Sequence, residues 1–152
     1  MNHSIRTARA ALVALAASAA LVGLPALFAP RSFYDDFPGL RHWVDLLPPY
    51  NQHLVTDVGG LYLGFAIVFA WAAWRPVRDL VFAACAGWTF AALAHFIYHA
   101  THLDNFGTGD AIAELVSLLL VVILPGAAVL GVLAHERPVA SRAAATGVTN
   151  DA

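Results

Sequence analysis

The sequence has no lysine, a single cysteine and few charged residues of either sign. Only 12% of its 152 residues are charged, whereas soluble domains contain about 25%. Cys85 alone cannot form an internal disulfide or supply a thiolate metal cluster. Eight arginines against ten acidic residues leave a net charge of −2, without a basic block for nucleic acid. These shortages argue against a soluble enzyme, a disulfide scaffold, a disordered chain and a nucleic-acid partner.

Apolar residues make up 60% of the chain and gather in four long segments. A helix needs about 20 apolar residues to cross a bilayer, and in lipid its backbone must satisfy its own hydrogen bonds. We therefore expect the lipid bilayer as a partner and an all-α fold, a four-helix transmembrane up-down bundle. Residues 1–137 form this domain, and residues 138–152 are expected to be a disordered cytoplasmic tail. The predicted spans are residues 10–29, 54–74, 80–103 and 111–134.

The arginines indicate the orientation of the spans. Six of the eight arginines lie on one side of the predicted spans, and only Arg31 and Arg41 lie on the other, in the connection at residues 30–53. By the positive-inside rule, we expect a multi-pass protein of the bacterial plasma membrane with both termini cytoplasmic. An Ala-rich chain whose strong bases are all arginine is typical of a GC-rich bacterial genome. The arginines expected on the cytoplasmic side are Arg6, Arg9, Arg75, Arg78, Arg137 and Arg142.

The first span has an alternative interpretation as a secretory signal. Arg6 and Arg9 precede an apolar, Ala-rich run, and Ala17-Ser18-Ala19 fits the small-residue pattern of a cleavage site. Cleavage there would leave a short apolar core, and the apolar run continues well beyond it. An uncleaved helix is favoured, and a cleaved signal remains the alternative.

The connection at residues 30–53 is rich in aromatic residues, which are common where a protein meets lipid headgroups. Its composition predicts a short amphipathic helix from Pro38 to Leu47 on the membrane surface. Asn51 is a suitable N-cap for the next span. This connection is expected to cap the bundle, with a lid over a binding site as the alternative.

Three spans carry polar or small residues on one helix face, at spacings of four and three residues. Gly60 and Gly64 form a GxxxG pattern, which lets another helix approach closely and predicts a possible homo-oligomer. The three stripes are His53, Asp57, Gly60 and Gly64; His95, His99 and His102; and Asp110, Glu114 and Ser117.

The polar groups of these stripes fall at similar depths. With a rise of about 1.5 Å per residue, Glu114 lies about 6 Å inside Asp110, near the level of His99. An acid at the centre of a span costs about 2.5–3.5 kcal/mol, so the stripes are expected to face one another. The sequence thus predicts one cluster near the outer face, with His95 beneath the other members. Its members are His53, Asp57, His95, His99, His102 and Glu114.

Two interpretations of this cluster stay open. Hydrogen bonds between histidines and acids can hold helices together in lipid, with or without a link to proton transfer. Alternatively, imidazoles and a carboxylate can bind a transition metal, with zinc or copper as the candidates. A b-type haem has less support, because only His53 could face the histidines of the third span. No Gly-x-Ser-x-Gly elbow supports a catalytic serine.

The stretch Asn51-Gln52-His53-Leu54-Val55-Thr56-Asp57-Val58-Gly59-Gly60-Leu61-Tyr62-Leu63-Gly64 resembles the start of the second helix in DoxX-like proteins. These are small bacterial membrane proteins with four helices. The resemblance implies a four-helix membrane fold and leaves the activity open.

From these patterns we expect a non-enzymatic integral membrane protein whose cluster can bind a metal ion. The alternative is a membrane-embedded metal-dependent or redox enzyme, in which a bound metal activates water or exchanges electrons. A third class is a small proton-linked transporter subunit, because ionisable residues lie within the spans.

Overall fold

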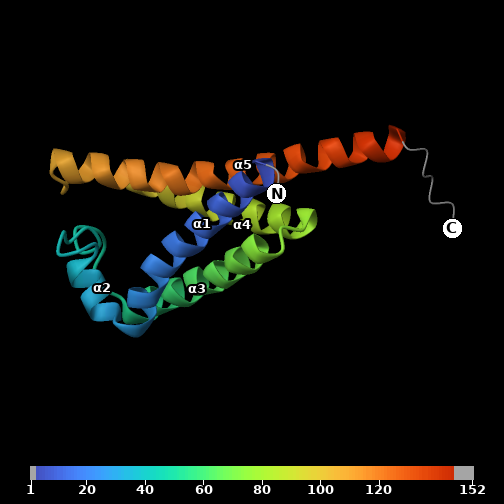
Figure 1. Ribbon diagram of the computed structural model, residues 1–152. Helices are drawn as coiled ribbons and strands as arrows, with labels where there is room; N and C mark the ends of the chain where they lie inside the picture. The colour runs from blue at the N-terminus through green and yellow to red at the C-terminus, as the bar shows by residue number, and fades with distance from the viewer. Residues whose placement is uncertain (1–2, 146–152) are drawn as a thin grey trace.

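The computed structural model describes residues 3–145 of the chain, and side-chain surroundings as far as Glu136. The described part is all-helical, with four long helices and a short one (Figure 1). Each long helix is long and apolar enough to cross a membrane, as expected for a multi-pass membrane protein. The five helices are α1 (His3–Phe28), α2 (Pro30–Asp36), α3 (Gln52–Trp74), α4 (Arg78–Ala100) and α5 (Thr108–Ala145).

The long helices begin and end near the residues that the sequence predicts, with two extensions: α1 begins at His3 instead of residue 10, and α5 runs beyond residue 134. The Asn51 side chain caps α3, since its oxygen accepts a hydrogen bond from Leu54 N at 3.1 Å. Helix α5 continues to Ala145, into the segment that is expected to be a disordered tail. The rest of that segment, residues 146–152, lies outside the described residues.

The short helix α2 precedes the segment that the sequence predicts to be helical. Residues 37–50 contain turns and bends, with positive φ angles at Leu40 (68°) and His42 (62°). A right-handed helix excludes such angles. A short helix in this connection is therefore confirmed, but its predicted position from Pro38 to Leu47 is wrong.

Local side-chain chemistry explains why α2 forms earlier. Pro30 stands at the start of the helix, where its missing N–H has no cost. Arg31 Nε donates to Asp35 at 2.7 Å, and Ser32 donates to Asp36 at 2.9 Å. The hydrogen bond to Asp35 raises the pKa of the Arg31 guanidinium above its ordinary value. These contacts at spacing i,i+4 join successive turns of the short helix.

The long helices pack as two antiparallel pairs. At one end of the first pair, Arg9 on α1 donates to the carbonyl of Trp74 at the end of α3, at 3.5 Å. In the second pair, Arg78 at the start of α4 contacts Glu136 on α5, also at 3.5 Å. Helix α1 also packs against α5 near its own N-terminus, whereas the two pairs diverge towards α2 (Figure 1).

We call the diverging end of the molecule the loop end; it comprises α2, residues 37–51 and the α4–α5 loop. Arg41 Nη1 lies 2.5 Å from Asp110 Oδ1 at the start of α5. Asn105 Nδ2 in the α4–α5 loop donates to the Leu46 carbonyl at 3.1 Å. Two polar contacts therefore fasten residues 37–51 to the second helix pair.

An aromatic cluster fills the space between α3 and α4. The ring of Trp88 lies 5.4 Å from that of Tyr62, 5.3 Å from Phe65 and 5.4 Å from Phe69, each in an edge-to-face arrangement. Edge-to-face packing is a favourable geometry for aromatic pairs. These contacts orient α3, because they direct the Tyr62, Phe65 and Phe69 face of the helix towards α4.

The contact between α1 and α3 depends on a glycine. A Cβ added at Gly59 would lie 2.8 Å from backbone atoms of Ala26 and Leu27, too close for the two helices to remain in place. A Cβ at the adjacent Gly60 would meet nothing within 4 Å. Only Gly59 therefore faces the close approach of α1.

We expect Gly59→Ala to lower the free energy of unfolding by about 1–3 kcal/mol, the usual cost of overpacking. Gly60→Ala is the matched control, and we expect it to be neutral or stabilising by up to about 1 kcal/mol, because alanine favours helix more than glycine. Both can be measured by detergent titration of dilute protein, with circular dichroism as the signal. Equal effects of the two changes would contradict the close approach at Gly59.

Candidate functional site

A buried polar contact joins the last turn of α4 to the first turns of α5. His99 Nδ1 lies 2.6 Å from Glu114 Oε1, and the two side chains are only 11% and 4% exposed. The short loop between the helices brings these turns side by side. The contact is not aligned as a hydrogen bond, and Nδ1 has no hydrogen-bond partner within the part of the chain that the structure describes. The two groups are in contact, but their hydrogen-bonding capacity is not used.

The second carboxylate oxygen of Glu114 has no partner within residues 3–136. Oε2 is buried and accepts no hydrogen bond. Leaving a buried polar atom unpaired costs about 1–3 kcal/mol. The ring of His95, one turn earlier on α4, lies 4.3 Å from the His99 ring and is more exposed. We call His95, His99 and Glu114 the polar centre.

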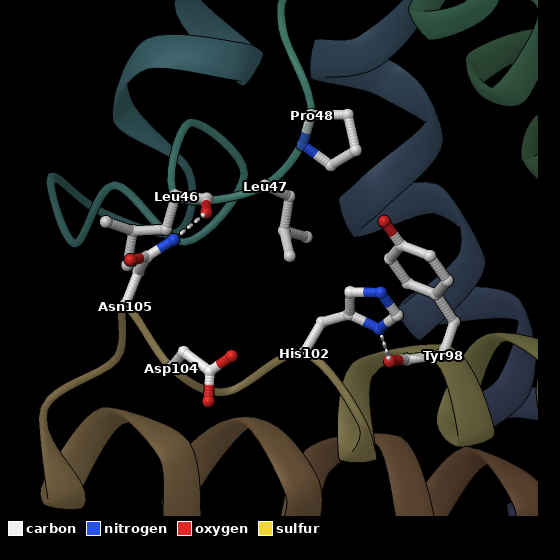
Figure 2. Close-up of a pocket in the computed structure, with 7 residues that line it drawn as sticks. All are labelled: Leu46, Leu47, Pro48, Tyr98, His102, Asp104 and Asn105. Carbon is white, nitrogen blue, oxygen red and sulfur yellow. Dashed lines mark hydrogen bonds between the residues drawn. The ribbon is translucent and has the colours of Figure 1, made fainter.

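The predicted cluster member His102 lies beside a cavity at the loop end. Its Nδ1 is 2.8 Å from the Tyr98 carbonyl, and its ring stacks on the Tyr98 ring at 4.1 Å. When Nδ1–H donates to a backbone carbonyl, the other ring nitrogen is left as an acceptor, here on the side of the cavity (Figure 2). The cavity has a volume of about 260 Å³ and is lined by Leu46, Leu47, Pro48, Tyr98, His102, Asp104 and Asn105.

The cavity and the polar centre are neighbours. The ring of Tyr98 stacks on the ring of His102 at 4.1 Å and lies 5.9 Å from the ring of His99, in an edge-to-face arrangement. Figure 2 shows residues 46–48 across the cavity from Tyr98 and His102. The cavity therefore lies next to the polar centre at the loop end.

The other two predicted members, His53 and Asp57, lie elsewhere. They contact each other, with His53 Nε2 3.3 Å from Asp57 Oδ2, and their side chains are 87% and 55% exposed. Within residues 3–136, neither forms an ion pair or hydrogen bond with the polar centre. The structure thus brings His99 to Glu114 and His95 to His99, and it places the pair on α3 apart from them.

The remaining members of the α5 stripe have separate partners. Asp110 contacts Arg41, as described above, and Ser117 Oγ donates to the Glu114 carbonyl at 2.8 Å. Ser117 is therefore engaged with the helix backbone. Of the three stripe residues, only Glu114 faces the histidines of α4.

The donors of the polar centre suit a transition metal, but they are not arranged as a ligand set. Within residues 3–136, no three side chains of His, Cys, Asp or Glu are placed to hold a metal ion. Imidazole nitrogen and carboxylate oxygen are common ligands of zinc and copper. An ion at this centre would require the side chains to rotate.

Several residues at the loop end were not expected to be near a site. Tyr98 occupies position i−4 from His102, so the helix spacing alone could have identified it. Asp104 and Asn105 lie in the loop, and Leu46 to Pro48 approach from a distant part of the sequence. The alternative interpretation of residues 30–53 as a lid anticipates such an approach, but the sequence does not indicate which residues of this connection make it.

No family model matches the chain, and no curated protein or solved structure matches it either.

Proposed function

We propose that this membrane protein is non-enzymatic and that its polar centre binds a transition-metal ion, zinc or copper. The observation that carries the proposal is the buried carboxylate of Glu114, whose Oε2 has no partner among the described side chains. An ionised carboxylate in a membrane requires a compensating positive charge. The imidazole of His99 lies beside it, and the ring of His95 lies 4.3 Å from that of His99. A carboxylate with two imidazoles is a known ligand set for zinc.

The change needed to admit an ion is small. Zinc binds nitrogen and oxygen at about 2.0–2.2 Å, so two ligands of a tetrahedral ion lie about 3.3 Å apart. His99 Nδ1 and Glu114 Oε1 are now 2.6 Å apart and would separate by less than about 1 Å. The more exposed ring of His95 is free to turn towards them as the third ligand.

The candidate nucleophiles nearest the polar centre on α4 and α5 favour binding over catalysis. The hydroxyl one turn further along α5, Ser117 Oγ, is held by the Glu114 carbonyl. Cys85 is buried in the core, more than three turns before His99 on α4. The described part of the chain therefore offers no activated nucleophile at the polar centre.

The proposal includes the location and orientation of the protein. Arg6, Arg9, Arg75 and Arg78 all lie at the end of the molecule opposite the loop end. This distribution supports a bacterial plasma-membrane protein with cytoplasmic termini. The polar centre then lies near the outer face.

Metal analysis tests the proposed binding. Protein purified in mild detergent is incubated with zinc or copper, freed of excess ion and analysed by mass spectrometry for metal per chain. We expect stoichiometric metal in the unchanged protein. It should be lost in His99→Ala and in Glu114→Gln, which keeps the shape of the side chain but removes its charge.

His53→Ala is the matched control, because His53 is exposed on α3 and should not affect the metal content. Each variant is first compared with the unchanged protein by circular dichroism, so that loss of metal is not confused with unfolding. Absence of metal from the unchanged protein, or equal binding by Glu114→Gln, would contradict the proposal.

The direct contact between His99 and Glu114 favours a second candidate function. At 2.6 Å the two groups are in contact without an ion between them. A rotation of the His99 ring that aligned Nδ1 with the carboxylate would let the pair share one proton and remain neutral overall. The polar centre would then act as a clamp between α4 and α5. A metal-free protein that is destabilised by His99→Ala would identify this function.

A further inference from the structure

Helix α3 carries a long face that no other part of the described chain covers. Its residues alternate in spacing between four and three, the pattern of a helix seam that packs against another helix. Every member is exposed, including Ile67 at 70%. We call this face the α3 seam: His53, Asp57, Gly60, Gly64, Ile67 and Trp71.

The α3 seam points away from α1 and α4, the two long helices that contact α3. At 3.6 residues per turn, its centre lies about 150° around the helix from the aromatic face that packs on Trp88. It lies about 120° from the face of Gly59, which contacts α1. The seam therefore remains open after α3 has made all its contacts within the chain.

The two glycines of the seam differ from those at the helix contacts. A Cβ at Gly23, Gly59 or Gly131 would lie within 3.0 Å of another helix. A Cβ at Gly60 or Gly64 meets nothing within 4 Å. Small residues in membrane helices permit close approach of backbones. In this chain the other three glycines serve that purpose, and the seam offers the same surface without an occupant.

The polar end of the seam provides an independent argument for a partner. Asp57 lies inside a candidate membrane span, yet its side chain is 55% exposed, and within residues 3–136 its only ionisable partner is His53 at 3.3 Å. Acids in spans normally face protein or water, because exposure to lipid is costly. A partner that covers Asp57 must therefore supply a hydrogen-bond donor or a positive charge.

A second copy of the chain meets this requirement. Two copies in one membrane have the same orientation, so their α3 helices run parallel about a two-fold axis normal to the bilayer. Residues at the same level then meet, and His53 of each copy lies one turn from Asp57 of the other. A surface that carries both members of the pair is self-complementary, as a two-fold interface requires.

We propose that two copies of this chain associate through the α3 seam, with their closest approach at Gly60 and Gly64. The His53–Asp57 pairs of the two copies cover each other at one end of the interface, and Trp71 lies at the other end. The polar centre on α4 and α5 takes no part, so this inference is independent of the proposed metal binding.

Cross-linking in lipid vesicles tests the proposal. In a Cys85→Ala background, Trp71→Cys places a single cysteine on the seam near the end of the span. Leu130→Cys is the control, because Leu130 is exposed on α5, outside the seam. With a thiol oxidant, we expect a disulfide-linked dimer from Trp71→Cys and only background from Leu130→Cys. Equal cross-linking of the two would overturn the proposal.

Glycine variants then test the interface itself. We expect Gly60→Leu with Gly64→Leu to lower the association constant at least about tenfold, measured by energy transfer between labelled copies in vesicles. Gly126→Leu is the matched control, because a Cβ there also meets nothing within 4 Å. Since no intrachain contact opposes the leucines, the fold should be retained, as checked by circular dichroism. Unchanged association of the double variant would overturn the proposal, and lipid would then be the occupant of the seam.

Discussion

Replacement of Trp88 by alanine is expected to lower the free energy of unfolding by about 3–5 kcal/mol, the usual cost of removing a buried large aromatic side chain. Trp88 is 4% exposed and packs edge-to-face on three rings of α3. Its loss would leave a cavity between the two helix pairs. Detergent titration monitored by circular dichroism gives the change, with Trp74→Ala, an exposed tryptophan, as the control.

The indole N–H of Trp88 has a second role that a smaller change isolates. Pro125 has no N–H, so it cannot form the helix hydrogen bond to the carbonyl of Val121, four residues earlier. Trp88 Nε1 donates to this carbonyl at 3.0 Å. The side chain of α4 thus satisfies a backbone acceptor that a proline leaves free in α5, where lipid offers no alternative donor.

A double-mutant cycle measures this coupling. We expect Trp88→Phe to cost about 1–3 kcal/mol beyond the change in packing, because the Val121 carbonyl is left unpaired. Pro125→Ala restores the helix N–H, so in that background Trp88→Phe should cost less by a similar amount. An equal cost of Trp88→Phe in both backgrounds would show that the carbonyl does not depend on the indole.

The helices themselves could be predicted from the sequence, because long apolar runs in lipid leave few alternatives to helix. The second predicted span, residues 54–74, lacks only the first two residues of α3, and the Asn51 cap explains where that helix begins. The short helix was predicted too late in the chain, because composition does not reveal the positive φ angles of Leu40 and His42.

The rotation of α3 could not be predicted. Periodicity identifies which residues share a face, but it does not determine which neighbour that face meets. Here Gly59 fits against α1 and the aromatic face fits against Trp88, so His53 and Asp57 are directed away from α4 and α5. Glu114 and His99 do meet, because a short loop joins their helices and leaves little freedom of register.

The buried contact between His99 and Glu114 leads to the second large effect. We expect His99→Leu to destabilise the protein by about 3–5 kcal/mol, the cost of removing one partner from a buried ionisable pair. The reason is that the Glu114 carboxyl group, 4% exposed, would lose the one ionisable side chain that contacts it within residues 3–136. Detergent titration in metal-free buffer measures the change, and His53→Leu, on an exposed face, is the control.

The reciprocal change is expected to cost less. Glu114→Leu leaves His99, which can remain a neutral imidazole, and a neutral ring is less costly in hydrocarbon than a carboxyl group that must be kept protonated. The double variant, with leucine at both positions, should recover much of the stability, because an apolar pair of similar size can replace a buried polar pair without loss. If His99→Leu and Glu114→Leu cost the same and their effects simply add in the double variant, the two side chains are not coupled. The contact would then not hold α4 to α5.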